Sequence, residues 1–242
     1  MDIIKAIASE LNVRNGQVEA AVKLIDEGCT IPFISRYRKE ATGALNDEQL
    51  RNLDERLKYL RNLEDKKAQV IESIEEQGLL TDELKAQIEK AGTMVAVEDL
   101  YRPYRPKRRT RATIAKEKGL EPLANVIMLQ MTKEPLVKAA EAYVSGDKGV
   151  NTPEEAIAGA MDIIAESISD KADYRTRIRE ITFKEGILSS TAKDADAKTV
   201  YEMYYNFTEP VAKMAGHRIL AVNRGENEKI LTVKIEAPED KI

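Results

Sequence analysis

One long amphipathic segment constrains the fold of this 242-residue chain more than any other feature. Asn46 and Gln49 form a capping-box pattern, a helix of residues 47–77 should follow, and Gly78 should end it. Its apolar stripe consists of Leu50, Leu53, Leu57, Leu60, Ile71 and Ile74 and is interrupted at Glu64 and Lys67. The pattern predicts two packing contacts along one long helix rather than a continuous coiled coil.

Apolar residues at helical spacing recur through most of the chain and predict an all-α fold, an elongated multi-helix scaffold of about ten helices. The N-terminal stretch "IASELNVRNGQVEAAVKLI" has the length and spacing of a helix-turn-helix-like hairpin. Acidic residues on its second helix, Glu19, Asp26 and Glu27, would repel phosphate. An ordinary helical hairpin is therefore favoured over one that reads DNA.

A further helix should begin at Thr152-Pro153, where a cap residue is followed by proline at the first helical position. Its predicted buried side consists of Ile157, Met161, Ile164 and Ile168.

The C-terminal part differs in character, because Leu231, Val233 and Ile235 alternate with polar neighbours as in a strand. Residues 217–224 fit a helix or a strand equally well. The sequence thus predicts a small β element there. A lone strand has little to pair with, so we expect the chain to stop inside a larger protein.

Composition favours a cytoplasmic protein. Charged residues make up 33% of the chain, above the ~25% usual for globular domains. The single cysteine, Cys29, rules out an internal disulfide framework and fits a reducing compartment. We identify no signal peptide and no apolar run near the ~20 residues that a membrane span requires, so no membrane partner is expected.

The sequence contains few side chains or motifs that are typical of a catalytic site. His217 is the only histidine, and no phosphate-binding glycine motif occurs. Cys29 has no local histidine partner, and acid pairs such as Asp194 and Asp196 are common on solvated helix ends. We therefore expect no enzyme activity, no cofactor and no metal site.

The most unusual stretch is "LYRPYRPKRRTRA", residues 100–112. The chain has a formal net charge of −4, yet residues 101–118 hold eight Lys/Arg and one acid. Because a residue before proline avoids the helical region, Arg102 and Arg105 should be extended. The candidate nucleic-acid-binding residues here are Tyr101, Arg102, Tyr104, Arg105, Lys107, Arg108, Arg109 and Arg111.

Two interpretations of this stretch have equal weight. Its cations can neutralise phosphates while exposed tyrosines stack on bases. Alternatively, the tyrosines and prolines anchor a structural loop, and Arg102 and Arg105 pair with Glu98 or Asp99.

A second basic cluster, Arg36, Arg38 and Lys39 around Tyr37, lies in "SRYRKEATG". Taken alone, it is typical of a solvated helix end, where cations complement the helix dipole. If both clusters lay on one surface, a nucleic-acid contact would be favoured.

The chain resembles the N-terminal region of the bacterial Tex proteins, which are transcription accessory factors. The residues that carry the resemblance are "IPFISRYRKEATGALNDEQLRNLDERLKYLRNL", "EDLYRPYRPKRRTRATIAKEKGLEPLA" and "HRILAVNRGENEKIL". The resemblance implies a helical Tex-type N-terminal domain over residues 1–190 and a truncated connecting segment over residues 191–242.

Tex proteins are longer, so the resemblance implies that RNase-H-like, helix-hairpin-helix and OB-fold RNA-binding domains are absent here. It also implies that the principal grip on RNA or DNA belongs to the missing part, with the transcription machinery as a further candidate partner. The chain itself would be a non-catalytic scaffold whose basic loop makes an auxiliary contact. The alternative is a purely structural or protein-docking scaffold.

Overall fold

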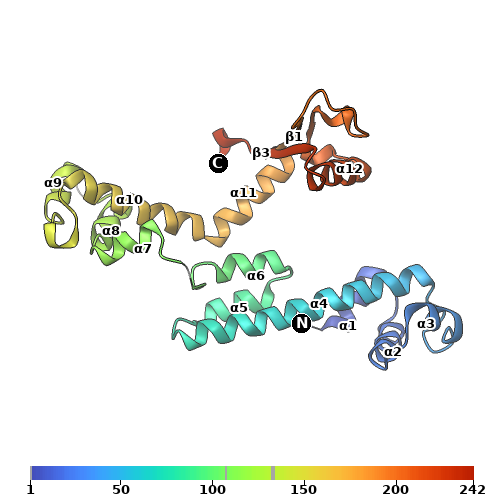
Figure 1. The fold of residues 1–242 in the computed structure, drawn as a ribbon. Coiled ribbons are helices and arrows are strands. Elements are labelled where there is room, and N and C mark those ends of the chain that lie inside the picture. Colours follow the sequence, from blue (N-terminus) through green and yellow to red (C-terminus); the bar gives the residue numbers. More distant parts are fainter. Residues whose placement is uncertain (1, 107, 132–133) are drawn as a thin grey trace. The chain divides into compact units, whose positions relative to one another are not determined.

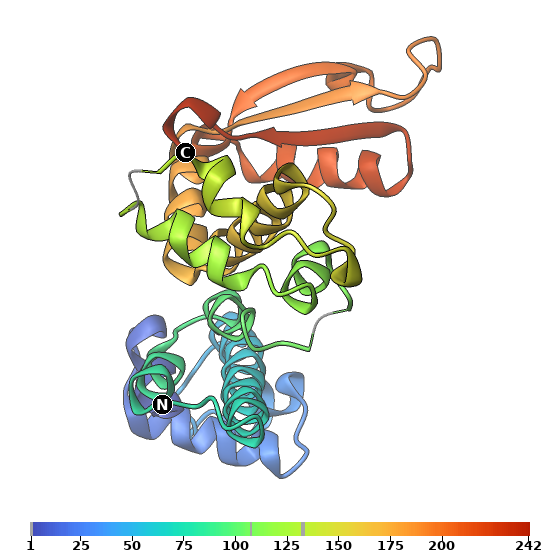
Figure 2. The ribbon, with the colours of Figure 1, turned by 90° about the vertical axis from the view of Figure 1, so that its left-hand side faces the viewer.

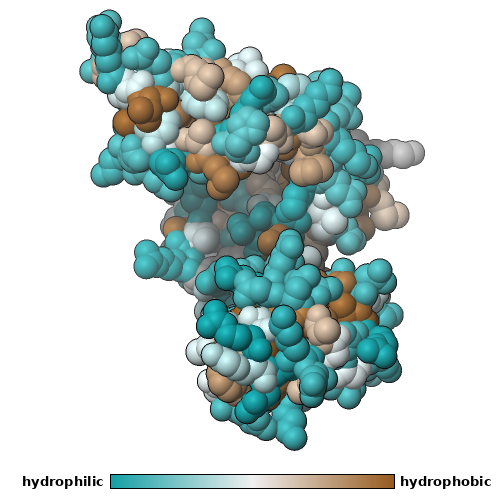
Figure 3. Space-filling view, turned by 90° about the vertical axis from the view of Figure 1, so that its right-hand side faces the viewer, coloured by the Kyte–Doolittle hydropathy of each residue, from teal (hydrophilic) through white to brown (hydrophobic). Residues whose placement is uncertain are grey.

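The fold is seen in a computed structural model that describes residues 2–106, 108–131 and 134–242. The chain divides into two compact units, residues 1–107 and 108–242, which we describe separately. Most of the described residues are helical (Figure 1). On the face drawn in Figure 3, hydrophilic side chains predominate and hydrophobic ones form small patches between them.

The first unit is all-helical and is built along one long helix. Its elements are α1 (Ile3–Leu11), α2 (Asn15–Asp26), α3 (Ile31–Tyr37), α4 (Asp47–Glu76), α5 (Asp82–Lys90) and α6 (Met94–Tyr101). Helix α4 contacts each of the other five. Both helices of the predicted N-terminal hairpin, α1 and α2, are present. Their assignment to the helix-turn-helix class stays a prediction.

Helix α4 begins and ends where the sequence predicts. The side chain of Asn46 accepts from the Gln49 amide at 2.8 Å, and Gly78 has a φ of +69°. The buried face consists of Leu50, Leu53, Leu57, Leu60, Leu63, Lys67, Val70 and Ile74. Lys67 interrupts the apolar stripe as predicted, but it does so as a buried residue and is part of the buried face.

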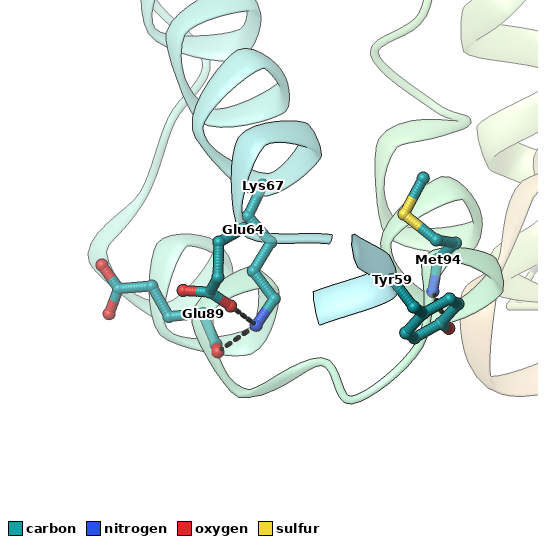
Figure 4. A network of polar contacts seen from close by, with 5 residues as sticks. All are labelled: Tyr59, Glu64, Lys67, Glu89 and Met94. Carbon is teal, nitrogen blue, oxygen red and sulfur yellow. Dashed lines mark hydrogen bonds and ion pairs between the residues drawn. The ribbon is translucent and has the colours of Figure 1, made fainter. Parts of the chain in front are cut away.

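Lys67 is 3% exposed and links α4 to α5 (Figure 4). Its ammonium group lies 2.8 Å from Glu64 Oε1 and donates to the Glu89 carbonyl at 2.9 Å. A buried lysine requires such partners, because an unpaired charge in the protein interior is strongly unfavourable. Two turns earlier on α4, the Tyr59 hydroxyl accepts from the Met94 amide at 3.2 Å, at the start of α6. Polar contacts from α4 thus position both following helices.

The second unit combines helices with a small sheet. Its elements are α7 (Arg111–Glu117), α8 (Glu121–Leu129), α9 (Leu136–Glu141), α10 (Pro153–Asp170), α11 (Ala172–Glu185), β1 (Ile187–Ala192), β2 (Asn206–Pro210), α12 (Gly216–Asn227) and β3 (Leu231–Glu236). Short 3₁₀ helices are Gly146–Lys148, Glu202–Tyr204, Val211–Lys213 and Glu239–Lys241.

Helix α10 packs against α7, α8 and α9, and only part of the predicted face takes part: Ile157 and Ile164 pack against the core of this helix group. Met161 is 60% exposed and Ile168 is 44% exposed, whereas Ala156 and Ala160 are buried. The cause is close approach: a Cβ on Gly159 would lie 2.4 Å from Leu120 Cδ1. Small residues therefore face the core of this helix group together with Ile163, whereas Met161 and Ile168 of the predicted set face solvent.

The predicted small β element is a three-stranded antiparallel sheet in the order β2-β1-β3 (Figure 2). The strand predicted around residue 233 is confirmed, but the expectation that it lacks a partner is wrong, because Val233 pairs with Ser190. Residues 217–224 are helical, within α12. A Cβ on Gly225 would lie 2.6 Å from Leu231 Cδ1, so glycine allows α12 to pack against β3.

The boundary predicted at residue 190 falls within β1, and that domain division stays a prediction. No helix in the described ranges is both long and apolar enough to span a membrane.

We expect Glu64→Ala to destabilise the fold more than Lys67→Met. The first change leaves a buried ammonium group without its carboxylate and should lower the free energy of unfolding by about 2 kcal/mol. The second removes the charge and keeps much of the apolar volume, so its effect should stay within about 1 kcal/mol. Urea unfolding of both variants measures the difference. Equal losses would contradict a role for the ion pair.

The same pair predicts a dependence on pH. The hydrogen bond from Lys67 holds the pKa of Glu64 below its usual value. A carboxylate with a lowered pKa stabilises the fold above its unfolded pKa of about 4.3, and this contribution is lost as pH falls through the folded pKa. The stability difference between the natural chain and Glu64→Gln should thus be constant near pH 6 and shrink below about pH 4. A difference that stays unchanged down to pH 3 would exclude this linkage.

Candidate nucleic-acid interface

The first half of the basic stretch is anchored to the core of the first unit by its tyrosines. The Tyr101 hydroxyl and Ser73 Oγ lie 2.9 Å apart, and Lys66 Nζ lies 5.8 Å from the Tyr101 ring centroid. Tyr101 and Tyr104 are both half-buried against the apolar cluster of this unit. Their contacts support the anchoring interpretation, and stacking of these two rings on bases stays an untested prediction.

The backbone of this half corrects the predicted extended conformation at Arg102. Arg102 is helical, with φ −52° and ψ −42°, although Pro103 follows it. The Tyr101 carbonyl accepts from the Tyr104 amide at 2.9 Å and from the Arg105 amide at 3.0 Å. Continuing the turn places Tyr104 three residues beyond Tyr101, against the same cluster. Packing of two rings therefore outweighs the local preference before proline.

In the first half of the basic stretch, positive charge is partly neutralised by a nearby carboxylate. Arg105 Nη1 lies 3.7 Å from Glu98 Oε2, as one of the predicted pairings requires, and Lys66 Nζ lies 2.7 Å from Glu98 Oε1. Arg102 is exposed and also has an interaction partner. Lys107 lies outside the described residues.

The second half of the stretch belongs to the second unit and leads into α7. Thr110 caps this helix: its hydroxyl accepts from the Thr113 amide at 3.1 Å and lies 3.0 Å from Glu166 Oε1. Arg109 Nη2 lies 2.7 Å from Glu117 Oε2, and Arg111 Nε lies 3.5 Å from Asp162 Oδ1.

Arg108 differs from these neighbours. It is exposed, and it has no carboxylate partner among the residues that the structure describes. Most described cations of the stretch thus have partners within the protein. That weakens the nucleic-acid interpretation of the stretch without testing it.

The second basic cluster has the opposite character. Arg36, Arg38 and Lys39 are exposed, and within residues 2–106 none of them has a carboxylate partner. Their neighbours are aromatic: the Arg38 guanidinium lies 5.1 Å from the Phe33 ring centroid, and that of Arg36 lies 6.0 Å from the Tyr37 ring centroid. We call this group of five residues the α3 cluster, and no carboxylate among the described residues neutralises its three cations.

Hydrogen bonds from two side chains hold the backbone at the end of the α3 cluster, at Arg38 and Lys39 and in the turn that follows. The buried Thr42 hydroxyl donates toward the carbonyls of Arg38 and Lys39, at 3.2 Å and 3.3 Å. From α2, the Gln17 amide group donates to the Gly43 carbonyl at 2.8 Å. Gly43 and Ala44 both have positive φ, +59° and +65°. The chain after α3 is therefore a tightly bonded turn, which fixes where the cations are presented.

Among the described residues, no group of His, Cys, Asp and Glu side chains could hold a metal ion. His217 is exposed in the first turn of α12.

Comparison with known proteins identifies the family. Residues 1–75 match the Tex-like protein N-terminal domain, and residues 130–242 match the Tex central region-like domain. The chain belongs to the Tex family. The α3 cluster lies within the Tex N-terminal match, whereas residues 100–112 lie between the two matched ranges.

Relatives match nearly the whole of this Tex-family chain. It is 50% identical to YdcI of Bacillus subtilis over 98% of the chain and 33% of that protein. It is 42% identical to the transcriptional accessory protein Tex of Neisseria gonorrhoeae, over 99% of the chain and 32% of that protein. The human S1 RNA-binding domain-containing protein 1 is 28% identical over 97% of the chain and 24% of that protein. The chain thus spans about a third of the length of its bacterial relatives.

The turn after α3 predicts a large effect for one substitution and a small effect for the substitution next to it. Gly43→Ala adds a Cβ at positive φ that would lie 3.0 Å from Gln17 Nε2, and it should lower the free energy of unfolding by about 1–2 kcal/mol. Ala44→Gly relieves the strain of a positive φ at residue 44, but glycine also increases the conformational entropy of the unfolded chain. These two effects oppose each other, so the change in the free energy of unfolding should stay within about 0.5 kcal/mol. Thermal unfolding compares the two. A larger loss for Ala44→Gly would contradict the assigned turn.

Proposed function

We propose that this chain is a non-catalytic helical scaffold of a transcription accessory factor, and that the cations of the α3 cluster give it an auxiliary contact with nucleic acid. The family and the name of the Neisseria relative, a transcriptional accessory protein, support the role in transcription. RNA, DNA and the transcription machinery are the proposed partners of the longer protein.

One observation carries the proposed contact. Arg36, Arg38 and Lys39 lack acidic partners among the described residues, so a bound phosphate need not displace a carboxylate. Ionic contacts of this kind supply most of the non-specific affinity for nucleic acid. Because Glu40 is the only acid in residues 31–45, the local field favours a polyanion.

A scaffold role for the basic stretch is supported by its own contacts. Arg105, Arg109 and Arg111 lie near carboxylates of α6, α7 and α10, respectively. Each pair is largely exposed and should contribute at most about 1 kcal/mol. We propose that these arginines chiefly orient the ends of neighbouring helices, with Arg108 available for a second, weaker contact.

Two triple variants with the same change in net charge test this assignment. Arg36→Ala/Arg38→Ala/Lys39→Ala should remove most binding of a labelled single-stranded RNA at low salt. It should also flatten the slope of log affinity against log salt by about 2, because three phosphate contacts are lost. Arg105→Ala/Arg109→Ala/Arg111→Ala should retain most of the affinity. Fluorescence anisotropy over a salt series measures both quantities.

Equal losses in the two triple variants would mean that only net charge matters. A larger loss for the second triple variant would move the contact to the basic stretch. If the natural chain did not bind at low salt, the structural or protein-docking alternative would replace the proposal.

A further inference from the structure

We propose that Tyr37, backed by Phe33, is a stacking platform for an unpaired base, which makes single-stranded nucleic acid the ligand of the α3 cluster. This inference rests on the proposed function and adds the class of ligand to it.

The two rings are arranged in an inner and an outer position. Their centroids are 5.4 Å apart with planes tilted by 46°, Phe33 is 37% exposed and Tyr37 is 61% exposed. The Arg38 guanidinium lies 5.1 Å from the Phe33 centroid, within the range of a cation–π contact. Phe33 therefore has neighbours in Tyr37 and Arg38. The neighbours of Tyr37 are Phe33 and the more distant Arg36 guanidinium, 6.0 Å from its ring centroid, and this outer ring is mostly open to solvent.

The hydroxyl group of Tyr37 supports the same interpretation. Among the described residues it has no hydrogen-bond partner, unlike the hydroxyl of Tyr101, which is 2.9 Å from Ser73 Oγ. The Tyr37 ring thus has no anchoring contact of the kind that Tyr101 makes. Single exposed aromatic rings are common on proteins, so the exposure of Tyr37 alone would not indicate a binding site. The open ring here lies among three cations for which the described part of the chain offers no acidic partner, and single-strand binders use this combination.

Duplexes fit this surface less well than single strands. Stacking on Tyr37 requires a base with a free face, and internal bases of a duplex are already stacked on both sides. The cations beside the ring can contact the phosphates of a single strand, and stacking tolerates any base because every base has a π-face. An acidic protein segment is the competing occupant, since tyrosine and arginine are also frequent in protein interfaces. The number of unpaired cations around one open ring favours the nucleic acid.

The experiment uses two labelled oligonucleotides with the same number of phosphates, one with bases and one abasic. The natural chain should bind the first more tightly by about 5- to 150-fold, the range for one stacked base. Tyr37→Ala should lose this preference and keep its affinity for the abasic strand, and Tyr37→Phe should retain the preference. Because the ring is largely exposed, the melting temperature of each variant should stay unchanged.

Tyr174→Ala is the matched control. Tyr174 on α11 is 45% exposed, and Lys171 Nζ lies 5.2 Å from its ring centroid, so it too is an open tyrosine beside a cation. Removing it should change neither affinity.

The outcomes separate this inference from the function on which it rests. Equal binding of both strands, unchanged by Tyr37→Ala, would overturn stacking and leave the ionic contact in place. Loss of preference in Tyr174→Ala as well would overturn the assignment to Tyr37. Absence of binding to either strand at low salt would overturn both proposals. In that case, binding of poly-glutamate that Tyr37→Ala abolishes would identify an acidic protein segment as the occupant.

Discussion

The apolar stripe of α4, with a lysine ion pair set into it, is the constraint on which the first unit depends. Each neighbouring helix packs against this one helix, so an error in its rotation would displace all of them. Apolar packing alone tolerates sliding, because leucine side chains have no directional contacts. The bonds of Lys67 to Glu64 and to the Glu89 carbonyl add direction at one point of the stripe. The Ser73–Tyr101 contact does the same one helix further along, and the basic stretch begins there.

Pairing between charges, rather than their number, separates the two basic clusters. Residues 102–111 contain six cations and residues 36–39 only three. The partner of Arg109 is eight residues away and that of Arg111 is fifty-one residues away, so the second is brought close only by the fold. A count of charges along the sequence therefore favours the cluster that the folded chain largely neutralises. The smaller cluster retains its charge because its neighbours are aromatic rings and a bonded turn.

The sequence predicted both ends of α4 and the start of α10, but few of the long-range contacts. Caps such as Asn46 and Thr152, and glycines such as Gly78, act through residues three or four positions away, so local sequence contains the necessary information. The features that the local sequence did not predict share a different cause. Lys67 is buried because of a carbonyl on α5, and Arg102 is helical because Tyr104 packs on a distant core. β1 was missed because "ILSSTA" has too little apolar alternation, and its pairing with β2 and β3 depends on segments far along the chain.

The bonded turn after α3 affects how tightly the α3 cluster can bind a ligand. A flexible arginine or lysine loses rotamer freedom on binding, and a mobile backbone would add a further loss at each residue. Thr42 and Gln17 remove the backbone part of that loss in advance, since they hold the carbonyls of Arg38, Lys39 and Gly43 in the free protein.

Three cations and one ring still form a small surface, whose intrinsic affinity should be weak. Tethering would offset this weakness: a second site on the same polypeptide would raise the local concentration of the strand to about the millimolar range. The proposed contact, weak by itself, would then strengthen binding by the longer protein. The small size of the α3 cluster therefore agrees better with the proposed accessory contact than with an independent binding domain.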